Sequence, residues 1–77
     1  MNQSQEVKQK IMEAISSFEN IEELWFSPAL NRWVVRISGG FNSVAMAGVA
    51  SCGFFDRGEI FQHSPYAFTL YFKNEED

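Results

Sequence analysis

A single cysteine, Cys52, in a chain of 77 residues rules out two of the usual ways to stabilise a small fold. One cysteine cannot form an internal disulfide bond, and it supplies only one of the ligands that a structural zinc ion needs. A chain this short buries only ~60% of the surface that its unfolded form exposes, so its stability is marginal. Stability must therefore come from dense packing or from oligomerisation. The composition suits both, because eight Phe, two Trp and two Tyr make 16% of the chain aromatic.

The charge balance argues against nucleic acid as a partner. Ten acidic and six basic residues give a net charge of −4, whereas nucleic-acid binding depends on clustered Lys and Arg. The polar first residues show no secretory pattern, and no run approaches the ~20 apolar residues of a membrane helix, so we expect a cytoplasmic protein with no membrane partner. Glu19, Glu22 and Glu23 form one acidic group and residues 75–77 another; we interpret both as solvated surface, the alternative being a patch that meets a basic partner.

The first segment predicts an amphipathic helix over about residues 3–18. Apolar residues recur there at steps of three and four, and the opposite face carries Lys, Gln and Glu. Asn2 or Ser4 is suited to cap the first turn, and Asn20 to adopt the left-handed conformation that ends a helix. The predicted apolar face consists of Val7, Ile11, Ala14, Ile15 and Phe18.

Strands are predicted at about residues 21–26, 32–38, 42–50 and 66–73. Pro28 and Asn31 favour a turn between the first two strands. Gly39 and Gly40 suit a tight hairpin turn between the second and the third, in a register that places Val35 opposite Val44 and Trp33 opposite Met46. In the last strand, residues 66, 68, 70 and 72 alternate with residues 67, 69, 71 and 73, which is typical of a strand with one buried face.

The third of these segments also has a helical interpretation. Ser43 would cap such a helix, Gly53 would follow its last turn, and the Ala and Met content between them favours it. We prefer the strand. The predicted fold class is α+β: a single domain over residues 1–77, with one N-terminal amphipathic helix packed on a small antiparallel sheet of three or four strands.

The stretch "GFFDRGEIFQHSP" gathers several chemically capable side chains behind Cys52. A catalytic interpretation makes Cys52 the nucleophile, His63 the base, and Asp56 or Glu59 the orienting group. No spacing supports that set, either as a catalytic site or as a metal site, and Cys52 lies among small residues that suit a buried position. We therefore expect residues 56–58 to form a turn, and we predict no catalytic residue, no metal site and no cofactor.

The surface opposite the predicted helix is the candidate binding site. One helix covers only one side of a sheet, so the second side must meet water, a loop or a partner. In the register above, that side holds Val34, Arg36, Ala45, Ala47 and Val49, with Thr69 and Tyr71 from the last strand. The parity of the first strand is open, so either Trp25 or the pair Leu24 and Phe26 joins them. An alternative is that residues 53–65 fold back and cover it. The residues predicted to bind a partner, including a second candidate surface around Phe55, are Trp25, Val34, Arg36, Tyr71, Phe55, Asp56 and Arg57.

These features predict a small non-enzymatic protein-binding module that docks another protein, or a second copy of itself, through the aromatic sheet face or residues 54–61. In size, charge and element order the chain is similar to many phage and mobile-element proteins that inhibit larger host machines. An inhibitor or regulator of a larger bacterial or phage-target protein is therefore the expectation. The alternative is a homodimer that binds a small ligand or acts as an enzyme, with an aromatic-lined pocket in which Cys52 or His63 supplies polarity.

Overall fold

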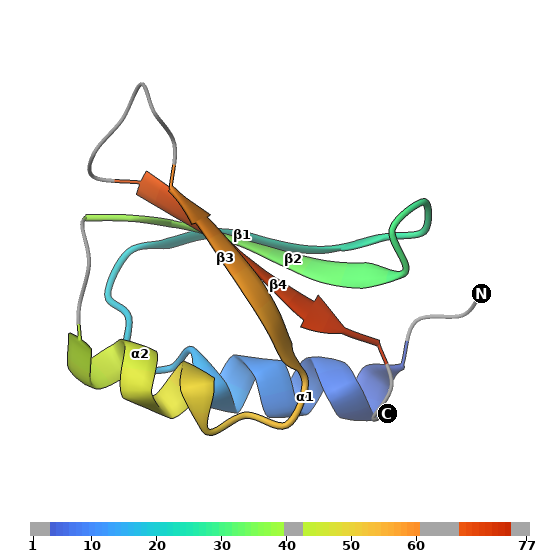
Figure 1. Cartoon of the computed structure of the whole chain (residues 1–77), viewed down its shortest axis with the longest axis horizontal. Coiled ribbons are helices and arrows are strands. Elements are labelled where there is room, and N and C mark those ends of the chain that lie inside the picture. Colours follow the sequence, from blue (N-terminus) through green and yellow to red (C-terminus); the bar gives the residue numbers. More distant parts are fainter. Residues whose placement is uncertain (1–3, 40–42, 61–66, 75–77) are drawn as a thin grey trace.

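The computed structural model describes residues 4–39, 43–60 and 67–74 of the chain. Its elements follow the order α1 (Gln5–Ala14), β1 (Ile21–Ser27), β2 (Arg32–Ser38), α2 (Ser43–Ala50), β3 (Phe55–Ile60) and β4 (Ala67–Lys73). The strands form one antiparallel sheet in the order β1-β2-β4-β3, and both helices lie on the same side of it (Figure 1). The predicted α+β class is confirmed, with a second helix added. No helix in the described part of the chain combines the length and apolar character needed to cross a membrane.

Helix α1 begins as its sequence predicts and ends earlier. Ser4 is the N-cap, with an extended backbone, and its Oγ accepts a hydrogen bond from the Val7 N–H at 3.2 Å. The helix ends at Ala14, and a turn continues the chain so that Ile15 and Phe18 are still buried. The left-handed conformation predicted for Asn20 is wrong. Among the described residues it occurs outside glycine only in the β1–β2 turn, where Asn31 has φ 52°.

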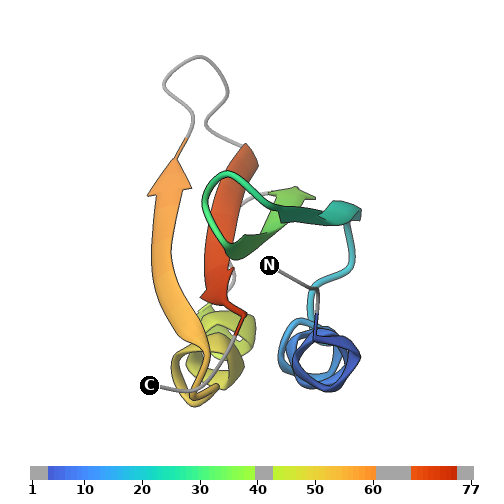
Figure 2. The same ribbon diagram turned by 90° about the vertical axis from the view of Figure 1, so that its right-hand side faces the viewer.

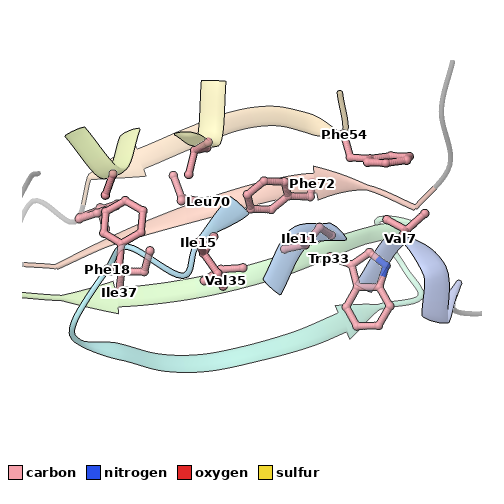
Figure 3. Packing of buried hydrophobic residues seen from close by; sticks show 13 residues of the cluster. Val7, Ile11, Ile15, Phe18, Trp33, Val35, Ile37, Phe54, Leu70 and Phe72 are labelled. Atoms are coloured by element: carbon pink, nitrogen blue, oxygen red, sulfur yellow. The ribbon is translucent and has the colours of Figure 1, made fainter. Parts of the chain in front are cut away.

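The core lies between the helices and one face of the sheet, as Figure 3 shows. Strand β2 pairs with β1 on one side and with β4 on the other, so Val35 lies opposite both Leu24 and Leu70. Alternate residues of each strand therefore point to the same face. The buried sheet residues are Trp33, Val35, Ile37, Phe68, Leu70 and Phe72, as their alternation predicts. They meet the apolar face of α1, which consists of Val7 and Ile11, followed by Ile15 and Phe18.

The predicted strand at residues 42–50 is wrong, because these residues form helix α2. Their Ala and Met content favours a helix, and Ala45 and Val49, four residues apart, are the two that point into the core. The edge of β2 that this strand was predicted to occupy is taken by β4. The hairpin register therefore fails: Val44 is 77% exposed, and Ala45, Ala47 and Val49 do not belong to the sheet.

The turn predicted at residues 56–58 is also wrong, because they lie inside β3 at the edge of the sheet. Phe55 pairs with Phe72 and Arg57 with Tyr71, so Asp56 is one extra residue in β3 and forms a β-bulge. Gly58 pairs with Leu70, and a Cβ built on this glycine lies 3.2 Å from a Leu70 methyl carbon. Without a side chain at Gly58, Leu70 can pack closely against the backbone of β3. Glycine is also common in turns, which is why the sequence alone suggests a turn here. His63 and residues 61–66 lie outside the described part of the chain.

Asn74 ties the start of α1 to the sheet. Its Oδ1 accepts hydrogen bonds from the Ser4 N–H at 3.0 Å and from the Trp33 Nε1–H at 2.9 Å. Trp33 is buried, and a buried indole N–H left without an acceptor is costly. Asn74 follows β4, so this one oxygen joins both ends of the described chain to β2. Nothing in the sequence pattern singled out this asparagine.

We expect Ile11→Ala to lower the free energy of unfolding by about 2–5 kcal/mol, because Ile11 is fully buried between α1 and the sheet. Met12→Ala is the matched control, since Met12 is the next residue of the same helix and is 46% exposed. Its effect should stay within about 0.5 kcal/mol. Urea unfolding followed by circular dichroism measures both. Equal effects of the two substitutions would contradict the assignment of α1 as the cover of the core.

Candidate functional site

The side of the sheet away from both helices carries a second set of side chains, which we call the open face. These residues alternate with core residues, as Trp25 does between Leu24 and Phe26, both packed on the core. The pairing of the strands places them in two rows that run across the sheet from β1 to β3. The first row is Trp25, Val34, Tyr71 and Arg57, and the second is Glu23, Arg36, Thr69 and Glu59.

Five predicted partner-binding residues share this open face: Trp25, Val34, Arg36, Tyr71 and Arg57. Trp25 is 42% exposed, Arg36 and Arg57 are exposed, and Tyr71 is half-buried. Val34 differs, because it is only 4% exposed although neither helix lies on this side. Val34 is paired with Trp25 on one side and Tyr71 on the other, so it forms the floor of the surface between two large side chains.

The structure separates Phe55 and Asp56 from this set. Phe55 packs on the core side, with its ring edge-on to Phe72 at 5.7 Å between centroids. Asp56 sits at the bulge of β3, where its Oδ2 accepts from Arg32 Nε at 3.1 Å. The alternative that residues 53–65 cover the open face does not hold for residues 55–60, which lie beside β4 as a strand.

Arg57, Glu59 and Tyr71 form a connected group at the β3 side of the open face. The Arg57 guanidinium carbon lies 4.7 Å from the centroid of the Tyr71 ring, within the range of a cation–π contact. The Tyr71 hydroxyl donates to Glu59 Oε2 at 3.3 Å, and Arg57 Nη2 lies 3.6 Å from Glu59 Oε1. Each side chain therefore limits the rotamers of the other two. The sequence does not predict Glu59 as part of the binding surface, because its spacing of two from Arg57 indicates a shared face only in a strand, and a loop is expected here.

A shallow hollow of about 250 Å³ lies beside this group, between the β1–β2 turn and β3. Its lining is Leu30, Arg32, Asp56, Arg57 and Tyr71. Leu30 is an exposed apolar side chain, and the charged residues around it include both signs. The volume lies below the ~300 Å³ at which ligand pockets usually begin, so the hollow suits a side chain of a docked protein better than a free ligand.

A larger groove of about 430 Å³ lies between the two helices, on the opposite side of the molecule. Cys52 and Phe54 line it together with small and polar residues of the two helices and of the turns that follow them. Phe54 is the only aromatic residue that the described part of the chain contributes to this lining. The alternative function, an aromatic-lined pocket that uses Cys52, stays a prediction. Within residues 4–39, 43–60 and 67–74, no three His, Cys, Asp or Glu side chains gather in a way that could hold a metal ion.

Comparison with protein-family models, with curated proteins and with solved structures found no match to this chain. The case for a function therefore depends on the geometry and chemistry of the open face.

The electrostatics of the Tyr71 group give it a measurable signature. Burial, and then the charge of Glu59 and its hydrogen bond, raise the pKa of Tyr71 above its ordinary value of 10.0, while the positive charge of Arg57 lowers it. A tyrosine whose pKa is higher in the folded state resists ionisation there. Its contribution to stability is complete below pH 10.0 and is lost as the pH rises through the raised pKa.

We expect Glu59→Gln to lower the titration midpoint of Tyr71, because the glutamine keeps an acceptor for the hydroxyl and removes the negative charge. Arg57→Gln should move the same midpoint upward, since it removes the neighbouring positive charge. The absorbance of the phenolate as a function of pH measures both midpoints. The same titration of Tyr71→Phe gives the contribution of the other tyrosine, which is subtracted. An unchanged midpoint in Glu59→Gln would show that the group is not connected as described.

Proposed function

We propose that this chain is a small non-enzymatic protein-binding module that docks a larger protein through the open face. The observation that carries the proposal is the first cross-strand row, in which Trp25, Tyr71 and Arg57 lie on one surface that neither helix covers. Trp, Tyr and Arg are the residues most often found to carry the energy of protein interfaces. A module of this kind carries out no reaction. It would inhibit or regulate its partner by occupying part of the partner's surface.

The packing of the row supports this use of it. Val34 supplies a buried apolar floor between Trp25 and Tyr71. Tyr71 and Arg57 are already oriented by their contact with each other and with Glu59. Side chains that are held before binding lose less conformational entropy on binding, so more of the contact energy remains as affinity.

The charge of the chain favours a basic partner. The net charge is −4, and Glu23 lies on the open face, two residues before Trp25 in β1. Glu22 is exposed in the same strand. Glu19 is exposed just before the same strand. Charges at the rim of an interface chiefly speed the encounter of complementary surfaces, so we expect the association rate to fall as the salt concentration rises.

Trp25→Ala tests this function, with Met12→Ala as its control. The two side chains are nearly equally exposed, 42% and 46%. Met12 belongs to α1, and this helix lies on the other side of the sheet from the open face. The wild-type chain and both variants, each checked for folding by circular dichroism, are used to capture protein from a lysate of the source cells. A partner that docks on the open face is retained by Met12→Ala and lost by Trp25→Ala.

The affinity of the purified partner for each variant then measures how much each side chain contributes to binding. We expect Trp25→Ala and Tyr71→Ala each to weaken binding by about 30-fold or more, as truncation of a central interface residue does. Calorimetry or surface plasmon resonance measures this ratio. If a specific partner binds all four chains with equal affinity, the open face is not its docking site.

A further inference from the structure

Strand β3 forms one edge of the sheet. One of its sides pairs with β4, and the other has no neighbouring strand among the described residues (Figure 2). Residues 56–59 of this strand are exposed. An edge strand presents backbone N–H and C=O groups that a further strand can pair with, and proteins that avoid such pairing place charges or bulges there. In β3 the bulge is at Asp56, near its beginning, which leaves the rest of the strand regular.

The charges of β3 complement a second copy of the same strand. Arg57 and Glu59 point to the open face on either side of Gly58. If two β3 strands run antiparallel with Gly58 opposite Gly58, then Arg57 of each copy lies opposite Glu59 of the other. Opposite charges directly across an antiparallel pair attract, and the two-fold axis makes this contact twice. The side chains in the internal Arg57–Glu59 pair are both more than half exposed, so they are able to reach across the edge.

Other registers are less favourable for the same physical reasons. A shift that centres the pair between Arg57 and Gly58 places Asp56 opposite Glu59, a like-charge contact made twice. It also places an open-face residue opposite a core-face residue, which turns the helices of the two copies to opposite sides. The register centred on Gly58 keeps both helical layers on one side of a continuous sheet.

Helix α2 gives an independent reason to place a second copy here. It lies on the β3 side of the helical layer, whereas α1 lies on the β1 side (Figure 2). No charged residue occurs between Arg36 and Asp56, so α2 has no charged face. Val44 is 77% exposed, and Ala47 and Ala50 are exposed as well. Surface helices normally carry charged and polar residues along their outer face, whereas α2 has only Ser43, at its start. So apolar a helix is typical of a buried position.

We propose that the chain forms a two-fold dimer in which β3 pairs antiparallel with β3 of a second copy, centred on Gly58. The two four-stranded sheets become one continuous sheet. The two α2 helices lie on the same face of this sheet, one on each side of the two-fold axis. This dimer uses the edge of the sheet and does not depend on the proposed docking role of the open face.

Charge reversal tests the pairing, with molecular mass measured by light scattering over a range of concentrations. The native chain is expected at twice the 8.8 kDa of one chain. Arg57→Glu places two Glu–Glu contacts across the axis, and Glu59→Arg places two Arg–Arg contacts there. Each variant alone should weaken the dimer by about 10-fold or more.

Rescue separates pairing from any structural role of these residues. An equimolar mixture of Arg57→Glu and Glu59→Arg chains restores opposite charges in both contacts, so a heterodimer should form. The double variant Arg57→Glu/Glu59→Arg should dimerise with itself. Trp25→Ala should dimerise like the native chain, which makes failure of this proposal distinguishable from failure of the open-face function.

The dimer proposal is overturned if the native chain is monomeric throughout, if the single variants dimerise like the native chain, or if neither the mixture nor the double variant restores the dimer. Should a variant fail to fold, hydrogen exchange of the native chain answers the same question. Backbone amides of β3 that point away from β4 should become protected as the concentration rises, and unchanged exchange would also overturn the proposal.

Discussion

Both helices of this chain pack on the same side of a four-stranded sheet, and the rest of the structure depends on that arrangement. Alternation along the strands sends Trp33, Val35 and Ile37 toward the helices, and with them Phe68, Leu70 and Phe72. The same alternation leaves Trp25, Tyr71 and Arg57 on the other side. The burial that stabilises the fold and the surface available for binding are therefore consequences of one pattern.

A single polar contact completes the apolar core at its end. The Trp33 indole lies in the core, and its N–H needs an acceptor that an apolar core cannot provide. Asn74 supplies that acceptor and at the same time receives the backbone N–H of Ser4 at the start of α1. With no disulfide and a short chain, such a contact fixes the helix on the sheet where packing alone leaves its end free to fray.

The sequence was informative where its periodicity was long and regular. The steps of α1 and the alternation of β4 predict most of the buried residues, although Ala14 is only half-buried. The open face follows from the alternation of Val34, Arg36 and Tyr71, whereas the sequence leaves open whether Trp25 or the pair Leu24 and Phe26 lies there. Short apolar runs are ambiguous between the two structures, which is why the strand predicted at residues 42–50 is in fact helix α2. Asp56 and Gly58 suit a turn as well as an edge strand with a bulge. The sequence groups Glu59 with Arg57 as exposed charges of a loop, but without β3 it does not place either of them beside Tyr71.

Hydrogen exchange of the two tryptophan indole N–H groups, followed by NMR on the partner-free chain, tests the one-sided cover of the sheet most directly. Trp33 is buried and donates to Asn74, whereas Trp25 is 42% exposed on the open face. The account predicts that the Trp25 indole exchanges near the rate of a free indole and that the Trp33 indole is slower by about 100-fold or more. A Trp25 indole as strongly protected as that of Trp33 would show that the open face is covered, and would contradict the account.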